Sequence, residues 1–166
     1  MSKSTDGLNE AFAGESQANR KYLAFAKRAD EEGYPQIAKL FRAAAAAETV
    51  HALTHFRTLG EIKSTAENLQ AAITGENYES TVMYPEFIQN ATDEGEKGAL
   101  RSFNYALAAE KVHEELYRAA LQNLAEKPTE IYDYYVCPVC GYTSPRNAPE
   151  RCPVCNTPGA RFEKIC

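Results

Sequence analysis

This 166-residue sequence has few cysteines and prolines over most of its length, and it lacks long apolar runs and basic stripes. No cysteine occurs before Cys137, and six of the eight prolines lie at or after Pro128. No stretch approaches the ~20 consecutive apolar residues that a membrane-spanning helix needs. No stripe of lysine and arginine is present that could neutralise a row of phosphates, so we expect no nucleic-acid partner.

The first residues, Met1 to Gly7, contain no apolar segment of the kind found in a secretory signal. We therefore expect a cytoplasmic protein without membrane association. Thiols stay reduced in that compartment, which favours metal binding over disulfides where cysteines occur in pairs.

The uneven composition predicts two domains, at 1–127 and 128–166. The first is rich in Ala, Glu, Leu and Lys, whereas the second holds all five cysteines. Residues 131–166 carry four basic and three acidic side chains, which leaves 14 basic and 20 acidic residues in the rest. The excess of acidic residues is typical of a solvated surface, but glutamates gathered at one buried point would add to it and would require cations.

Apolar periodicity and the positions of glycine and proline predict four helices. Their ranges are 5–31, 35–59, 76–94 and 98–126. Residues 64–67 form a capping box that predicts a further helical stretch, interrupted at Thr74-Gly75. The segment 61–75 could be a tight link or a crossover between two helical hairpins, and its helical pattern favours the crossover.

One four-residue motif occurs twice, as Glu48-Thr-Val-His51 and Glu110-Lys-Val-His113, at a sequence offset of 62. The same offset relates Tyr22 to Tyr84, Phe25 to Phe87, Gly33 to Gly95, Phe41 to Phe103 and Ala46-Ala47 to Ala108-Ala109. A Glu and a His three positions apart lie about 60° from each other on adjacent helical turns, so both can reach one point. A single motif of this kind is weak, but its duplication within a duplicated hairpin indicates a metal site.

Distances along the helices place the acidic residues at one level. Glu48 and Glu110 each stand at position +15 relative to the glycine of their own turn, Gly33 or Gly95. Glu15 and Glu79 stand at positions −18 and −16 relative to those same glycines. At about 1.5 Å per residue, the carboxylates of each hairpin agree in height within roughly one turn. The spacing predicts two antiparallel hairpins that share one polar layer.

Bare carboxylates inside a helical bundle are costly, and metal ions would pair them. Carboxylate and imidazole ligands suit iron or manganese. The pattern matches the general rule for four-helix carboxylate proteins, in which two helices each give a Glu and two give Glu-x-x-His. The matching residues are Glu15, Glu48 with His51, Glu110 with His113, and Glu76 or Glu79.

The neighbouring polar residues have two interpretations. Tyr22 and Tyr84 could donate hydrogen bonds to the ligating carboxylates, or they could be ordinary core tyrosines. His55 has no counterpart in the repeat, because the offset of 62 leads to Tyr117. We therefore interpret His55 as a residue that binds no metal.

The C-terminal segment contains two C-x-x-C loops, Cys137-Pro-Val-Cys140 and Cys152-Pro-Val-Cys155. Such loops aim four thiolates at one ion in a tetrahedral site, which suits zinc or iron. The residue after each loop often needs a positive φ; Gly141 supplies it freely and Asn156 tolerates it. A core this small needs a metal to fold. Cys166 is left over and is expected to be a free thiol.

The chain resembles the rubrerythrins over nearly its whole length. The resemblance is carried by the segments 11–18, 48–51, 75–79, 83–85, 110–113, 137–142 and 152–155. It implies a mainly α fold: a ferritin-like four-helix bundle followed by a small rubredoxin-like, metal-bound β module. It also implies two iron ions in a carboxylate-bridged site and one iron in the four-cysteine site, with zinc able to replace iron in recombinant material.

The resemblance further implies a role for each ligand. Glu48 and Glu110 match the bridging carboxylates, and Glu15 and Glu76 match terminal ligands. His113 matches a fixed ligand, whereas His51 and Glu79 match a pair that exchange on one iron.

The implied activity is peroxidase defence against oxidative stress, with hydrogen peroxide as substrate. A rubredoxin or an NAD(P)H-dependent reductase would donate the electrons, and a head-to-tail homodimer would bring the carrier of one subunit to the di-iron site of another. Two other functions remain open: a ferroxidase or iron-handling protein that uses O2, and a zinc ribbon that serves as a binding platform.

Overall fold

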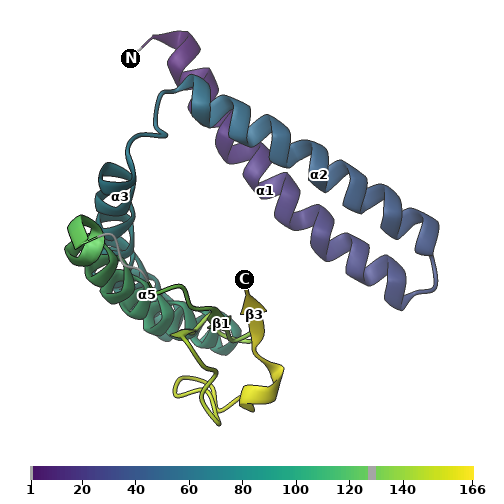
Figure 1. The fold of residues 1–166 in the computed structure, drawn as a ribbon. Coiled ribbons are helices and arrows are strands. Elements are labelled where there is room, and N and C mark those ends of the chain that lie inside the picture. Colours follow the sequence, from purple (N-terminus) through teal and green to yellow (C-terminus); the bar gives the residue numbers. More distant parts are fainter. Residues whose placement is uncertain (1, 127–129) are drawn as a thin grey trace. The chain divides into compact units, whose positions relative to one another are not determined.

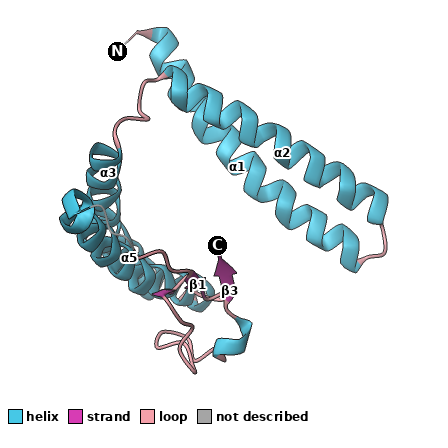
Figure 2. Cartoon of the chain, in the orientation of Figure 1, coloured by secondary structure: helices cyan, strands magenta, loops and turns pink. Residues whose placement is uncertain are grey.

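The computed structural model describes residues 2–126 and 130–166, and its chain divides between Lys63 and Ser64 into two compact units. The domain boundary expected at residues 127 and 128 lies outside the described residues. Helices dominate both units, and strands occur only near the C-terminus of the described chain (Figure 1, Figure 2).

The first unit is an antiparallel hairpin of two long helices, α1 (Lys3–Glu31) and α2 (Pro35–Thr58) (Figure 1). The Ser2 hydroxyl caps α1 by accepting a hydrogen bond from the Thr5 amide, and Pro35 stands at the start of α2, where its missing N–H costs nothing. The buried apolar residues of the hairpin are all alanines, namely Ala26, Ala29, Ala38, Ala45 and Ala52. These small side chains let the two backbones approach closely.

The helices of the second unit are α3 (Thr65–Tyr78), the π-helical turn η1 (Glu79–Met83), α4 (Tyr84–Asp93) and α5 (Lys97–Asn123), which ends in the 3-10 turn η2 (Leu124–Glu126). The capping box predicted at Ser64 and Glu67 is confirmed. The predicted break at Thr74-Gly75 is wrong, because α3 starts at Thr65 and continues past Gly75. A glycine inside a helix costs only about 1 kcal/mol, which packing against α5 can offset.

The two helical turns at Gly33 and Gly95 repeat the same structure. Each glycine has a positive φ, 82° and 72°, which its missing Cβ permits. The residue after each glycine donates to a carbonyl five positions back, Tyr34 to Ala29 at 2.8 Å and Glu96 to Ala91 at 2.9 Å. This pattern is the Schellman motif, and it ends both α1 and α4.

The π-helical turn η1 explains why the internal repeat changes register. From Tyr84 onward the repeat offset is 62, but before η1 it is 61, which relates Leu8 to Leu69, Ala11 to Ala72 and Gly14-Glu15 to Gly75-Glu76. A π-turn accommodates one extra residue in a helix. Glu76 is therefore the counterpart of Glu15, although a constant offset of 62 would assign Asn77.

The C-terminal part of the second unit forms a three-stranded antiparallel sheet in the order β2-β1-β3. Its strands are β1 (Tyr134–Val136), β2 (Thr143–Pro145) and β3 (Glu163–Ile165), with the 3-10 turn η3 (Gly159–Arg161) before the last. In the register, Tyr135 lies opposite Ser144 on one side and Lys164 on the other. Cys137, Cys140 and Cys152 form the buried centre of this module, against which Tyr142 and Phe162 pack.

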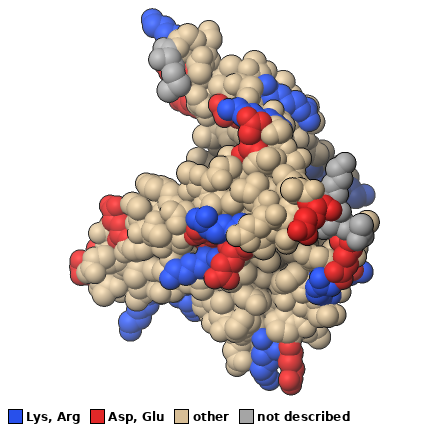
Figure 3. Space-filling model, turned by 60° about the vertical axis from the view of Figure 1, so that its left-hand side comes forward, with Lys and Arg blue, Asp and Glu red and all other residues tan. Residues whose placement is uncertain are grey.

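Charges of both signs are interspersed on the face of the molecule shown in Figure 3, so neither sign forms a separate field there. Within the described residues, no helix has the length and apolarity to cross a bilayer.

Candidate metal centres

The first unit holds one carboxylate–histidine set, made of Glu15, Glu48 and His51. Their ligand atoms lie within 4.8 Å of one another. The His51 Nδ1 atom is 2.8 Å from Glu48 Oε2, as expected for residues three apart on a helix. One turn away, the Asn19 amide joins α1 to α2 by donating to the Ala45 carbonyl at 2.7 Å. Glu15 comes from α1, and Glu48 and His51 come from α2, so both helices of the hairpin contribute to this set.

The second unit holds the repeated set, made of Glu76 on α3 and Glu110 with His113 on α5. These ligand atoms also lie within 4.8 Å of one another. The His113 Nδ1 atom is 2.7 Å from Glu110 Oε2 and 4.0 Å from Glu76 Oε1. All three side chains are mostly buried, with 26% of His113, 18% of Glu76 and 17% of Glu110 exposed.

Close packing of acidic groups in this second set perturbs their protonation. Burial, followed by a hydrogen bond to Glu110 and that residue's charge, raises the pKa of Glu76 to about 7. The hydrogen bond from His113 lowers the pKa of Glu110, and the same bond raises the pKa of His113. Without a metal, Glu76 and Glu110 thus share a proton near neutral pH. A bound cation would replace that proton.

Glu79 and Tyr84 lie beside this second set without belonging to its closest group. Burial, and then the negative charge of Glu110, raises the pKa of Glu79. Burial, and then the charges of Glu110, Glu79 and Glu76, raises the pKa of the Tyr84 phenol. Glu79 is the first residue of η1, and Tyr84 is the first residue after it. The structure thus places the predicted Glu79 and Tyr84 within electrostatic reach of Glu110.

Two aromatic clusters accompany the two sets and match each other closely. Tyr22, Phe25 and Phe41 have ring-centroid separations of 6.3, 6.2 and 5.6 Å. In the second unit, Tyr84, Phe87 and Phe103 have separations of 6.3, 6.3 and 5.5 Å. Tyr22 therefore has the same aromatic neighbours as Tyr84.

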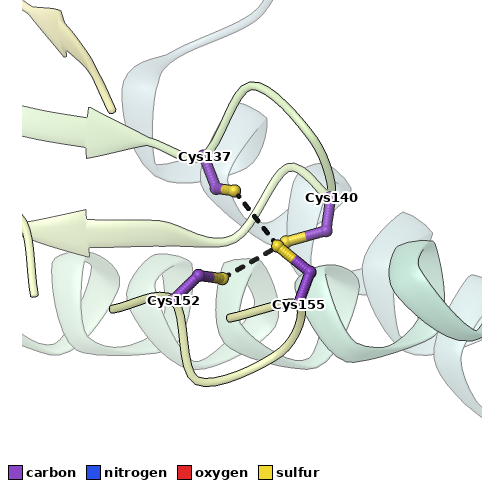
Figure 4. Close-up of side chains that lie close together, drawn as sticks. All are labelled: Cys137, Cys140, Cys152 and Cys155. Atoms are coloured by element: carbon purple, nitrogen blue, oxygen red, sulfur yellow. Dashed lines mark hydrogen bonds between the residues drawn. The ribbon is translucent and has the colours of Figure 1, made fainter. Parts of the chain in front are cut away.

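The four paired cysteines converge from two loops on one point (Figure 4). Cys137 Sγ lies 3.5 Å from Cys155 Sγ, and Cys140 Sγ lies 3.4 Å from Cys152 Sγ. These separations are far longer than a disulfide bond, and all four cysteines are free. In a tetrahedral site with metal–sulfur bonds of ~2.3 Å, the sulfurs would be about 3.8 Å apart. The four thiols therefore fit a single ion.

The loop backbones confirm the expected knuckle geometry. Gly141 and Asn156 both have positive φ, 79° and 63°, and each donates its amide to the carbonyl of the first cysteine of its loop, Cys137 or Cys152. Burial raises the pKa values of the Cys140 and Cys152 thiols. Burial acts in the same direction on Cys155, but hydrogen bonds, led by one from Thr157, outweigh it and lower the pKa of this thiol to about 6. A cation is needed to hold all four groups as thiolates.

The cysteine module lies against α5 beside the second carboxylate–histidine set. The Thr143 Oγ1 atom of β2 is 2.9 Å from His113 Nε2. A Cβ added at Gly141 would be 3.7 Å from Ala109 Cβ, so the loop after Cys140 is in close contact with the helix. A pocket of about 240 Å³ opens at this contact, and its lining includes Glu110, His113 and Cys140.

Most of the predicted ligands thus fall into three groups, with Glu79 close to one of them. His55 belongs to none of the groups of three or more potential ligands found in the described residues. Sequence reasoning missed Thr143, because its contact with a side chain far away in the sequence leaves no local pattern. It also missed the change of repeat offset from 61 to 62, which was present in the sequence and would have identified Glu76 as the counterpart of Glu15.

The donor types fit iron at both kinds of site. Paired glutamates and histidines on helices suit a di-iron centre, and four thiolates in knuckle loops suit a rubredoxin-like iron. The fold and sites thus define a helical di-iron carboxylate protein with an attached rubredoxin-like module.

Comparison with known proteins agrees with that class. The family model described as Rubrerythrin matches residues 6–121, and the model described as Rubrerythrin, rubredoxin-like domain, matches residues 135–163. The chain belongs to the rubrerythrin family, whose members are oxidoreductases.

Individual relatives match along most of their length. The chain is 38% identical to Rubrerythrin-2 of Clostridium acetobutylicum, covering 95% of this chain and 94% of the relative. It is 40% identical to a rubrerythrin of Porphyromonas gingivalis, covering 99% and 90%. A solved structure of nigerythrin in a mixed-valence state is 37% identical, with a TM-score of 0.60 over 99% of this chain and 88% of that one.

Proposed function

We propose that this chain reduces hydrogen peroxide to water. Each H2O2 takes up two electrons and two protons and gives two water molecules. The observation that carries the proposal is the position of the four-cysteine module against α5, beside Glu110 and His113. A one-electron carrier at this position supports repeated turnover, which iron storage does not need.

Seven residues would hold the di-iron centre. The first unit would contribute Glu15, Glu48 and His51, and the second would contribute Glu76, Glu79, Glu110 and His113, each in the role that the family resemblance implies. When bound, the irons supply Lewis acidity and electrons, and the iron held by Cys137, Cys140, Cys152 and Cys155 exchanges single electrons. The position of Glu79 outside the closest group of ligand atoms supports an exchanging role.

The protein's own groups can supply protons. Because the raised pKa of Tyr84 keeps its phenol protonated, its hydroxyl can donate a hydrogen bond toward the carboxylates of Glu76 and Glu110. Tyr22 would have the matching role beside Glu15, on whose helical face it lies.

The proposal includes a cellular setting. We expect a rubredoxin or an NAD(P)H-dependent reductase as electron donor, a head-to-tail homodimer, and a cytoplasmic location in which the four thiols stay reduced. The domains would be 1–127 and 128–166, a division supported by the separate matches to residues 6–121 and 135–163.

A stopped-flow comparison of two oxidants tests the activity. Protein with both iron sites reduced is mixed, in separate experiments, with hydrogen peroxide and with O2 at equal concentrations. A peroxidase should oxidise at least about tenfold faster with peroxide, equivalent to about 1.4 kcal/mol in the barrier. Faster oxidation by O2 would instead indicate a ferroxidase or iron-handling protein. Native protein that contains only zinc and has no visible thiolate–iron absorption would indicate a binding platform.

A further inference from the structure

The cysteine module contacts His113 of the second carboxylate–histidine set through the Thr143 hydroxyl and the Gly141 backbone. Thr143 Oγ1 lies 2.9 Å from His113 Nε2 and 3.1 Å from the Gly141 carbonyl oxygen. The threonine has one hydroxyl proton, and the carbonyl can only accept. When the hydroxyl donates its proton to the Gly141 carbonyl, its oxygen accepts a hydrogen bond from His113 Nε2.

This network determines which nitrogen of His113 carries a proton. Since Nε2 donates to Thr143, it is the protonated nitrogen of the neutral ring. The Nδ1 atom faces Glu110 Oε2, 2.7 Å away; in the metal-free protein a proton on Nδ1 occupies this contact, and a bound cation would replace it. Two acceptors at that distance need a cation or a proton between them. The tautomer is thus the one required for Nδ1 to bind a metal.

We propose that Thr143 is a positioning residue that fixes the tautomer and ring orientation of His113 for metal binding. This proposal rests on the role of His113 as a ligand in the proposed function. It makes the cysteine module part of the support of the second carboxylate–histidine set. The contact between Gly141 and Ala109 brings the module close enough to α5 for this role.

The first unit provides an internal comparison. His51 has the same Nδ1 contact with its own glutamate, at 2.8 Å, but 54% of its side chain is exposed. Within the described residues, no hydrogen bond to His51 Nε2 is found in this unit. Thr143 therefore distinguishes the surroundings of two histidines that the sequence repeat makes equivalent.

Three substitutions in the whole chain test the role of Thr143. Thr143→Val keeps the shape and removes the hydroxyl, whereas Thr143→Ser keeps the hydroxyl. Ser144→Ala is the matched control, because the Ser144 hydroxyl donates to the Asn147 carbonyl and does not contact His113. Each variant is prepared with zinc in the four-cysteine site, and equal zinc content and circular dichroism show that the module has folded.

Two measurements need no catalytic activity. Side-chain ¹H–¹⁵N spectra report the tautomer of His113, and titration with Co²⁺ reports the affinity of the carboxylate–histidine site. Thr143→Val should lose the protected Nε2–H signal of His113 and bind Co²⁺ about tenfold more weakly, the lower end of effects seen for such supporting residues. Thr143→Ser and Ser144→Ala should resemble the unsubstituted protein.

An unchanged Nε2–H signal and affinity in Thr143→Val would overturn the proposal. If Thr143→Val does not fold, Thr143→Ala takes its place and the same two results decide. Peroxide turnover is measured separately on unsubstituted protein. A protein inactive with peroxide, in which Thr143→Val still weakens Co²⁺ binding, would overturn the peroxidase proposal while supporting the positioning role.

Discussion

The His113 Nδ1 atom lies 2.7 Å from the Glu110 Oε2 atom, a separation almost equal to the 2.8 Å between His51 and Glu48 in the first unit. The duplicated motif therefore makes the same local structure twice. The surroundings differ, because Glu76 and the cysteine module accompany His113.

The metal-free protein should lose stability as the pH rises from about 5 to about 8. The pKa of Glu76 is raised from 4.5 to about 7, so between these values the folded state binds more protons than the unfolded state. Stability then falls with increasing pH across that window. Urea unfolding at several pH values measures the slope. Glu76→Gln, which cannot ionise, should flatten it, and an unchanged slope in this variant would contradict the assignment.

Glu48→Ala should abolish peroxide turnover while leaving the four-cysteine site intact. It removes a proposed bridging carboxylate, whereas the four thiols belong to the other compact unit. Iron analysis should show loss of the di-iron metal, and the visible absorption of the thiolate-bound iron should remain. Cys140→Ser is the complementary control, which should lose that absorption but keep di-iron metal. Full turnover by iron-depleted Glu48→Ala would exclude the proposed site.

The sequence predicted what depends on local pattern and missed what depends on packing. The positions of Gly33 and Gly95, the duplicated motif and the cysteine loops all have short-range causes, and the structure contains each of them. The continuity of α3 through Thr74-Gly75 was missed because a glycine is a weak helix breaker once its helix packs against another. The contact of Thr143 with His113 depends on how the cysteine module packs against α5, and no local sequence pattern specifies that packing.

Tyr84→Phe should slow the oxidation of reduced protein by peroxide by about tenfold, a modest share of what a proton donor can contribute. The reason is its position: burial and three carboxylates raise the pKa of its phenol, so the hydroxyl is a protonated donor beside them. Single-turnover stopped-flow mixing measures this step without electron resupply. Tyr117→Phe is a suitable control, since Tyr117 lies on α5 one turn beyond His113 and has no hydrogen bond to the carboxylates in the described part of the chain. Equal rates for Tyr84→Phe and unsubstituted protein would remove Tyr84 from the proton pathway.

Gly141→Ala should weaken metal retention by the cysteine module. Its φ of 79° costs a residue with a Cβ about 1–2 kcal/mol, whereas the new methyl group would meet Ala109 at an ordinary contact distance of 3.7 Å. Asn156→Gly is the matched substitution in the second loop, where φ is 63°, and it should be neutral or slightly stabilising. Zinc release to a chelator measures both variants. Faster release from Asn156→Gly than from Gly141→Ala would contradict the geometric argument.

Deletion of Thr81 should be tolerated, although deletions inside helices usually are not. Glu76 and Tyr84 are eight positions apart, and the π-turn between them absorbs the extra residue. Their counterparts Glu15 and Tyr22 are seven apart in an uninterrupted helix. Removing Thr81 restores that spacing, so a regular helix would keep both side chains on one face.

The matched control is deletion of Gln17 from α1. No π-turn exists there to absorb the change, so Glu15 would rotate by about 100° relative to Tyr22. Thermal unfolding and Co²⁺ stoichiometry compare the two deletions. We expect the protein lacking Thr81 to keep its metal stoichiometry and the one lacking Gln17 to lose metal. Equal loss of metal from both proteins would show that the π-turn has a role beyond absorbing one residue.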